Sequence, residues 1–170
     1  MQIRRANTKD IYNIAVLKQQ VWIATYAEEG IRTEFSKYVM SEFTYENIKK
    51  TLEDKSRVML IAETESHLLG CIEIALNKKC PVEIEIDCPE IAVLYVLERF
   101  KGKGIGRMLL EKSFEHMQSL NYKAAWLTVY HKNLGALEFY GKNQFKAIGT
   151  TNFVMDGNKY ENKVLLRNLD

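Results

Sequence analysis

Residues 90–110 read EIAVLYVLERFKGKGIGRMLL, and this stretch decides the fold. Its first part, Glu90–Leu97, is almost entirely apolar, which is typical of a central β-strand buried on both faces. The glycine-rich turn Lys101–Arg107 follows, and the pattern then becomes helical as far as Leu120. A buried strand, a glycine turn and a helix in succession predict one layer of an α/β structure.

The remaining sequence alternates between strand-like and helix-like segments. The strand-like runs, bounded by turn residues, are Met1–Arg5, Arg57–Glu63, Leu68–Leu76, Ala124–Tyr130, Phe145–Thr150 and Lys163–Leu169. Besides the helix after the glycine turn, runs with apolar residues three or four positions apart begin near Thr8, Thr44 and Leu134. These segments predict a mixed α/β (α+β) fold around one sheet, whose strand order the sequence does not reveal.

The composition is that of an ordinary globular protein. The 170 residues, 46% of them hydrophobic and 27% charged, fit a single domain over residues 1–170. A net charge of +2 gives no electrostatic reason to expect a nucleic-acid partner. Three cysteines without a CxxC pair favour a reducing compartment. No signal peptide or membrane-spanning run is visible, so we expect a cytoplasmic protein without a membrane partner.

The glycine-rich turn has the properties of a phosphate-binding site. Glycines let backbone N–H groups approach a ligand, and the start of the following helix carries partial positive charge. The GxxxxGK(S/T) spacing of a Walker A loop does not occur. The GxGxxG fingerprint fails as well, because Arg107 stands where the third glycine would be. What remains is a basic-x-x-G-x-G pattern, Lys101-x-x-Gly104-x-Gly106. The alternative is a turn that only caps a helix.

This pattern resembles the GNAT N-acetyltransferase superfamily. Members of the superfamily carry Q/R-x-x-G-x-G/A at the start of the long helix that binds the pyrophosphate of coenzyme A. Lys101 stands where the family usually has Gln or Arg, a departure that keeps the positive charge. The resemblance implies that the cofactor is bound by Lys101, Gly102, Lys103, Gly104, Ile105, Gly106 and Arg107.

A second stretch, WLTVYHKNLGALEFYGKNQF at residues 126–145, resembles the strand–Asn–helix–Tyr element of the same family. Asn133 and Tyr140 lie about two helical turns apart, so both can line one face. In the family the Asn contacts the pantetheine arm, and the Tyr hydroxyl acts as the acid that protonates the leaving thiolate. The alternatives are a helix cap for Asn133 and a core position for Tyr140. Gln144 replaces a family glycine, and we expect Asn143 or Gln144 to adopt a left-handed conformation.

The resemblance also implies roles for the central strand. The pantetheine arm is expected to lie along Leu94, Tyr95 and Val96, with the Val96 N–H polarising the thioester carbonyl. The general base is open. Thr128 occupies the position of a glutamate that serves in some relatives, whereas Glu90 matches the glutamate of another branch. Glu90 could have a raised pKa beside apolar neighbours, or it could be a solvated residue at the strand entry. A water chain is the third alternative.

Four acidic residues stand just before or on the central strand: Glu83, Glu85, Asp87 and Glu90. They would form either an acidic rim that favours a cationic amine or the polar face of an edge strand. The three histidines show no metal-ligand spacing, so we expect no metal.

The resemblance implies a mostly antiparallel sheet of six to seven strands flanked by four helices. It also implies an N-acetyltransferase that moves an acetyl group from acetyl-CoA directly to a primary amine. The amine would belong to a small molecule, a polyamine or a protein N-terminus. The segments Val129–Phe145 and Asn152–Leu166 look most like the PaiA-type polyamine acetyltransferases and the amino-terminal acetyltransferases of bacterial proteins. The rival hypotheses are a non-catalytic acyl-CoA-binding regulatory protein and a nucleotide-binding regulator. The oligomeric state is open and includes a homodimer.

Overall fold

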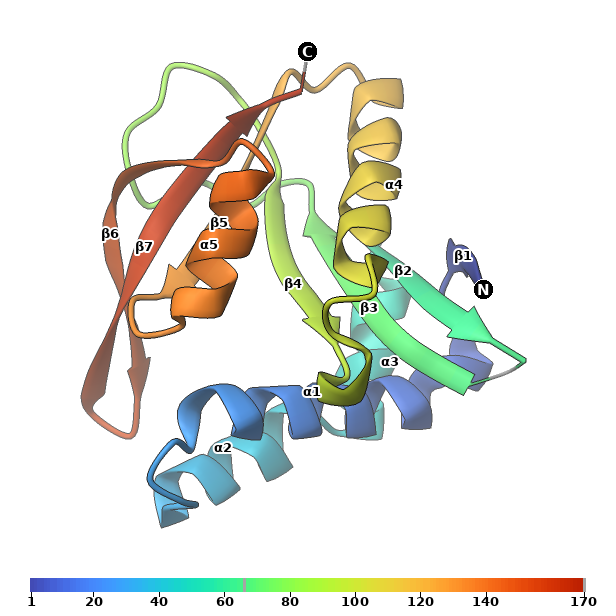
Figure 1. Cartoon of the computed structure of the whole chain (residues 1–170), viewed down its shortest axis with the longest axis vertical. Helices are drawn as coiled ribbons and strands as arrows, with labels where there is room; N and C mark the ends of the chain where they lie inside the picture. The colour runs from blue at the N-terminus through green and yellow to red at the C-terminus, as the bar shows by residue number, and fades with distance from the viewer. Residues whose placement is uncertain (66, 170) are drawn as a thin grey trace. The chain divides into compact units, whose positions relative to one another are not determined.

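The computed structural model of the chain describes residues 1–65 and 67–169 (Figure 1). Two compact units divide the chain: Met1–Ile74 with Val93–Ser113, and Ala75–Ala92 with Phe114–Asp170. The elements follow in the order β1 (Gln2–Arg5), the 3-10 turn η1 (Thr8–Asp10), α1 (Ile11–Tyr26), α2 (Thr33–Glu42), α3 (Tyr45–Glu53), β2 (Arg57–Thr64), β3 (His67–Ala75), β4 (Glu90–Val96), the 3-10 turn η2 (Glu98–Phe100), α4 (Ile105–Ser119), β5 (Ala124–Tyr130), α5 (Leu134–Lys142), β6 (Lys146–Met155) and β7 (Asn158–Asn168).

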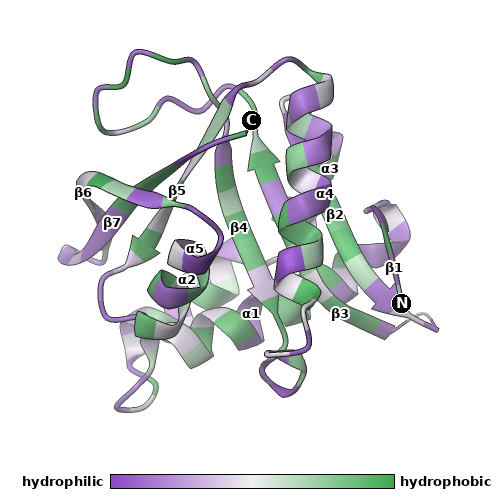
Figure 2. Ribbon diagram, turned by 45° about the horizontal axis from the view of Figure 1, so that its top comes forward, coloured by the Kyte–Doolittle hydropathy of each residue, from purple (hydrophilic) through white to green (hydrophobic). Residues whose placement is uncertain are grey.

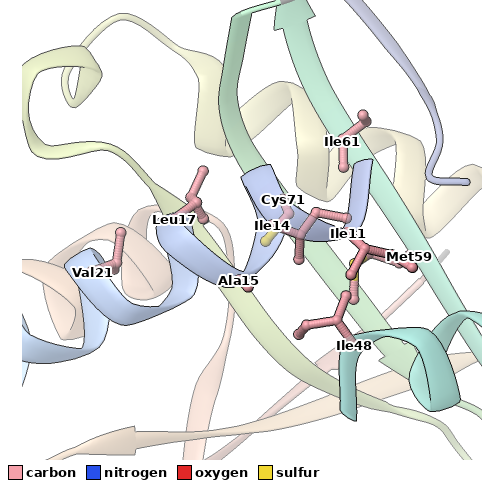
Figure 3. Close-up of a cluster of buried hydrophobic side chains, with 9 residues drawn as sticks. All are labelled: Ile11, Ile14, Ala15, Leu17, Val21, Ile48, Met59, Ile61 and Cys71. Atoms are coloured by element: carbon pink, nitrogen blue, oxygen red, sulfur yellow. The ribbon is translucent and has the colours of Figure 1, made fainter. Parts of the chain in front are cut away.

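The first unit packs α1 and α3 against strands β2 and β3. β1 and β2 are antiparallel, with Gln2 opposite Glu63 and Arg5 opposite Leu60. Figure 3 shows the core cluster that these elements share, formed by Ile11, Ile14, Ala15, Leu17, Val21, Ile48, Met59, Ile61 and Cys71. The α1 members recur at helical spacing, so they form one apolar stripe along the helix. Each fully buried isoleucine or leucine stabilises the unit by about 1.5–3 kcal/mol.

The second unit is built on the antiparallel strands β5, β7 and β6. β5 pairs with β7 from Ala124 opposite Asn168 to Tyr130 opposite Asn162. β6 and β7 form a hairpin whose turn, Asp156-Gly157, has left-handed φ angles of 47° and 80°. An Asp-Gly pair with both residues left-handed suits a two-residue hairpin turn. The core of this unit contains the buried residues Cys88, Ala124, Trp126 and Val164.

A loop over residues 77–89 covers part of that second core. Val82, Ile84 and Ile86 pack against the core cluster. Val82 approaches β6 so closely that a Cβ on Gly149 would lie 2.7 Å from Val82 Cγ2, which explains a glycine at that position. Glu83, Glu85 and Asp87, between the apolar residues, are exposed. The edge-strand interpretation of these acids is therefore wrong, because the segment has strand-like alternation but no strand pairing.

In the described part of the chain the sheet has seven strands in the order β1-β2-β3-β4-β5-β7-β6. The pair β4–β5 is parallel, with Glu90 opposite Trp126, whereas β1–β2, β5–β7 and β6–β7 are antiparallel. The predicted mixed α/β class and the mostly antiparallel sheet are confirmed. In Figure 2 strands β2 and β3 are largely hydrophobic, while α4 alternates between polar and apolar residues as an amphipathic helix does. The single domain over residues 1–170 stays a prediction.

Some details differ from the sequence-based expectations. Five α-helices occur in the described part of the chain rather than four, because α2 was not predicted. Only Phe35 and Val39 of α2 are buried, which leaves a weak apolar pattern. The run that begins near Thr8 starts as the 3-10 turn η1, which is capped by Asn7, whose side chain accepts from the Lys9 N–H. The central strand β4 is only partly buried along most of its length.

A buried ion pair connects α1 to β3 in the first unit. Lys18 Nζ lies 2.6 Å from Glu73 Oε2, and both side chains are almost completely inaccessible. Arg57 also donates to Glu73. Burial by itself would raise the pKa of Glu73, but the charges and hydrogen bonds of Lys18 and Arg57 outweigh it and lower that pKa. Glu73 therefore carries its negative charge at neutral pH.

We expect Glu73→Gln to destabilise the protein by about 3–5 kcal/mol, because it leaves the Lys18 ammonium buried without a carboxylate. Urea unfolding at pH 7 measures the loss. Glu138→Gln is the matched control, since Glu138 forms an exposed ion pair with Lys142 and its loss should not be measurable. Equal stability of the two variants would contradict a structural role for the buried pair.

Candidate functional site

The glycine-rich turn lies in the first unit and joins β4 to α4. The Phe100 N–H donates to the Leu97 carbonyl and the Lys101 N–H to the Glu98 carbonyl, so the chain turns sharply after the strand. Gly102 and Gly104 then have φ angles of 75° and 80°. L-residues with a side chain rarely adopt this left-handed conformation. The backbone conformation therefore favours glycine at both positions.

The start of α4 presents backbone donors. The Met108 N–H donates to the Gly104 carbonyl, 3.0 Å, so Gly104 stands at the helix cap position. The N–H groups of the first helical turn have no partner within a helix. Ile105 is buried and anchors the helix start, whereas Arg107 is exposed. These donors and the helix dipole together suit an anion.

The basic side chains of the turn are exposed and held by local partners. Lys101 pairs with Glu98, and Arg107 Nε lies 2.8 Å from Glu111 Oε1. The Lys103 ammonium stands 4.9 Å from the centre of the Phe100 ring. Exposed pairs of this kind are weak, so the cations can exchange these partners for a bound anion at little cost.

The backbone of β4 continues toward this turn. The Leu97 N–H donates to the Leu69 carbonyl of β3, 3.0 Å. Successive N–H groups of a strand point to opposite edges, so the Val96 N–H points away from β3. A Cβ on Gly70 of β3 would lie 2.7 Å from the Tyr95 carbonyl oxygen. Strands β3 and β4 therefore come this close only because residue 70 is glycine. The direction of the Val96 N–H is the one that a ligand lying along the strand would need.

Asn133 and Tyr140 belong to the second unit, at the two ends of α5. Asn133 Oδ1 accepts from the Ala136 N–H, 3.1 Å, so its predicted function as a helix cap is confirmed. Tyr140 is 8% exposed, and its ring contacts Phe139 and Phe145 at centroid distances of 5.2 and 5.5 Å. The predicted roles of both residues toward a cofactor remain predictions.

Burial raises the pKa of the Tyr140 hydroxyl above its ordinary value. A buried phenol is raised in this way because ionisation would place a negative charge in an apolar environment. The hydroxyl is therefore a hydrogen-bond donor throughout the neutral and mildly alkaline range. It is well suited to stabilise a negative charge that develops next to it.

Glu90 opens β4 in the second unit and is partly buried. Its position opposite Trp126 is clear, but its role as a base stays a prediction. Among the residues described, no group of three or more histidine, cysteine, aspartate or glutamate side chains is placed to hold a metal ion. None of the described helices has the length and apolar character needed to cross a bilayer.

A family model agrees with the geometry of the turn and the sheet. The model of the acetyltransferase (GNAT) family matches residues 22–145, which is most of the chain. The chain belongs to the GNAT acetyltransferase family. The resemblance predicted from the two sequence motifs is therefore confirmed.

Related GNAT proteins match over nearly their full lengths. A spermidine N(1)-acetyltransferase of Thermoplasma acidophilum is 27% identical over 95% of this chain and 98% of its own. An uncharacterized N-acetyltransferase of Archaeoglobus fulgidus is 27% identical over 86% of this chain and 93% of its own. The crystal structure of the PaiA N-acetyltransferase of Thermoplasma acidophilum in complex with coenzyme A superposes with a TM-score of 0.78. It is 22% identical and covers 98% of both chains.

The end of α5 departs from the usual GNAT sequence in the expected way. Gln144 has a φ of 65°, so the predicted left-handed residue is Gln144, while Asn143 has a φ of −96°. The Phe145 N–H donates to the Tyr140 carbonyl and the Gln144 N–H to the Gly141 carbonyl. These two bonds are those of a Schellman cap, which favours glycine at the left-handed position.

Sequence reasoning did not identify Asn162 as a candidate site residue. Asn162 is 7% exposed, and its side-chain oxygen is buried without a hydrogen-bond donor among the residues described. The signal was present, because Asn162 precedes Val164 and Leu166 at alternate positions of a strand. A polar residue on an apolar face of a strand is informative in itself.

Gln144→Gly should stabilise the protein by about 0.5–1 kcal/mol, because it removes the steric cost of a side chain in the left-handed conformation. Chemical denaturation at neutral pH measures the gain. Gln144→Ala is the control and should give no gain, since alanine keeps the Cβ that causes the strain. Equal stabilisation by both substitutions would show that the backbone is not strained there.

Proposed function

We propose that this GNAT protein is an acetyl-CoA-dependent N-acetyltransferase that acts on a primary amine. The observation that carries the proposal is the turn at Gly102 and Gly104, whose left-handed backbone leads into the α4 N-terminus within a GNAT fold. That arrangement suits a pyrophosphate, with Lys101, Lys103 and Arg107 supplying positive charge. Acetyl-CoA is the cosubstrate that this turn would hold, and the coenzyme A bound to the PaiA structure supports this choice.

In the proposed reaction the amine nitrogen attacks the thioester carbonyl carbon directly. A C–N bond forms, the C–S bond breaks, and the amine loses a proton as the thiolate leaves. The pantetheine arm would lie along Leu94, Tyr95 and Val96, and the Val96 N–H would stabilise the oxyanion. Asn133 would contact the pantetheine arm through its amide group. Holding the thioester and the amine together supplies a large part of the rate enhancement.

Tyr140 would stabilise the leaving thiolate. Its raised pKa means that the phenol holds its proton more tightly than an ordinary thiol does, so complete transfer to the thiolate is unfavourable in this environment. A hydrogen bond from the phenol to the developing thiolate avoids this problem and still lowers the barrier. Solvent then protonates the thiolate after the amide bond has formed.

The amine proton has two candidate acceptors in this chain. Glu90 is one, because it opens the central strand and is partly buried. A chain of water molecules is the other. Replacing the Glu90 carboxylate removes the base if Glu90 accepts the proton, but it leaves a chain of water molecules intact.

A cationic amine of the polyamine class is the acceptor that the observations favour. The loop over residues 77–89 holds Glu83, Glu85 and Asp87 in exposed positions, and such charges attract a polyamine. The spermidine N(1)-acetyltransferase that aligns with this chain supports the same class. Protein N-termini are the alternative acceptor.

We expect acetyl-CoA and spermidine to release coenzyme A thiol when the protein is added, as measured with a thiol reagent. Gly104→Val should weaken acetyl-CoA binding by roughly 100-fold or more, because it removes several charge-assisted backbone hydrogen bonds to phosphate. Gly157→Val is a matched control, because Gly157 has the same φ of 80° and open space around it. Calorimetry with acetyl-CoA and with ATP measures the binding.

Three results would contradict the proposal. Tight binding of ATP in place of acetyl-CoA would indicate a nucleotide-binding regulator. Binding of acetyl-CoA without thiol release across polyamines, aminoglycosides, amino acids and N-terminal peptides would indicate a non-catalytic acyl-CoA-binding protein. Equal loss of binding in the Gly104 and Gly157 variants would indicate general destabilisation rather than a phosphate site.

Tyr140→Phe should lower kcat by about 10- to 100-fold with little change in acetyl-CoA affinity, because it removes one hydrogen bond to the thiolate. The raised pKa keeps the phenol protonated, so ionisation of Tyr140 should cause no fall in kcat between pH 8 and about 10. The pH profiles of the wild type and of the exposed-site control Tyr45→Phe should match. A fall in kcat below pH 10 that disappears in Tyr140→Phe would contradict this role.

A further inference from the structure

One face of the β5–β7–β6 sheet carries a polar residue among apolar ones. Asn162 of β7 stands opposite Tyr130 of β5 and Thr151 of β6. Directly cross-strand residues share a face, so these three side chains lie on the same face of the sheet. Val164, two residues further along β7, is completely buried on that face. Asn162 therefore stands on the same face as the second core, between Val164 and Tyr160.

The side-chain carbonyl of Asn162 accepts no hydrogen bond from residues 1–65 or 67–169. Its oxygen is buried without a hydrogen-bond partner among the residues described, and the residue as a whole is 7% exposed. Such an oxygen loses its hydrogen bonds to water without a replacement, which is costly and therefore uncommon in folded proteins. An unpaired buried acceptor of this kind is one that a ligand donor can satisfy.

Aromatic residues share this face of the sheet with Asn162. The ring of Tyr160, two residues before Asn162, lies 6.2 Å from that of Tyr130 at an angle of 64°. The Phe153 ring lies 6.3 Å from that of Tyr160. All three are partly buried, and aromatic faces attract cations, more strongly where water is excluded.

The charges next to Asn162 in the chain do not oppose a cation on this face. Glu161 and Lys163 are its sequence neighbours, and alternate residues of a strand point to opposite faces. Lys163 Nζ lies 2.9 Å from Glu161 Oε1, so the two charges compensate each other on the opposite face. The face of Asn162 thus combines a hydrogen-bond acceptor with aromatic rings.

We infer that Asn162 is a binding residue for the amine substrate, and that its Oδ1 accepts a hydrogen bond from an alkylammonium group lying against Tyr130 and Tyr160. The inference rests on the proposed function, because it assigns a subsite to the acceptor amine. The ligand class is a primary alkylammonium ion. A cation without N–H groups can lie against the aromatic rings, but it cannot donate a hydrogen bond to the Asn162 carbonyl.

The test compares two cations that differ in N–H groups. The affinities of n-propylammonium and tetramethylammonium are measured by NMR titration, with and without coenzyme A. The wild type should bind n-propylammonium more tightly, and Asn162→Leu should weaken that binding by roughly 10-fold or more, while leaving tetramethylammonium affinity nearly unchanged. Asn152→Leu is the matched control, an exposed asparagine on β6, and should leave both affinities unchanged.

Stability provides a second measurement. Asn162→Leu has a similar volume and removes an unpaired buried oxygen, so its unfolding midpoint should equal or exceed that of the wild type. A large loss of stability would show that the oxygen has an internal partner, which would overturn the inference. Equal n-propylammonium affinity in the wild type and Asn162→Leu would overturn it as well, as would no detectable binding by the wild type.

The outcome is separable from that of the proposed function. The titration needs no turnover, so it gives an answer even if no amine is acetylated. Conversely, Asn162→Leu could leave the spermidine-dependent release of thiol from acetyl-CoA unchanged. That result would support the acetyltransferase activity and refute only the role of Asn162. Acetyl-CoA affinity should be the same in both proteins.

Discussion

The backbone passes from β4 to α4 through a turn whose left-handed conformation favours glycine, and the proposed chemistry depends on this constraint. The left-handed angles at Gly102 and Gly104 direct the chain so that the first N–H groups of α4 lie at the end of the turn. The buried side chain of Ile105 fixes the helix start at that place. The main-chain donors of the proposed anion site are thus set out by the fold itself, and the exposed lysines and arginine would only add positive charge to it.

The two units contribute in different ways. In the first, the Lys18–Glu73 pair and the apolar stripe of α1 hold a helix firmly on the strands beside the turn. In the second, the α5 end is strained at Gln144 and the β7 face contains the unpaired oxygen of Asn162. Local costs of this kind concentrate at functional positions in many proteins. The second unit is accordingly where we place the amine and the phenol.

Strong patterns made most of the fold predictable. The apolar run of β4, the helical stripe of α1 and the glycine turn each give an unambiguous local signal. Helix α2 gave almost none, because Phe35 and Val39 are its only buried residues. The Lys18–Glu73 pair joins residues 55 positions apart, and a single sequence contains no signal for such a pairing. The unpaired state of Asn162 likewise depends on its neighbours in space.

The contact between Val82 and Gly149 links two positions that are far apart in the sequence. Any side chain at 149 would occupy the space that the valine methyl groups now fill. Divergence at one of these sites is therefore constrained by the other, and a larger residue on β6 requires a smaller one in the loop. The loop over residues 77–89 and strand β6 are therefore coupled sterically, so a change in the backbone path of one requires an adjustment in the other.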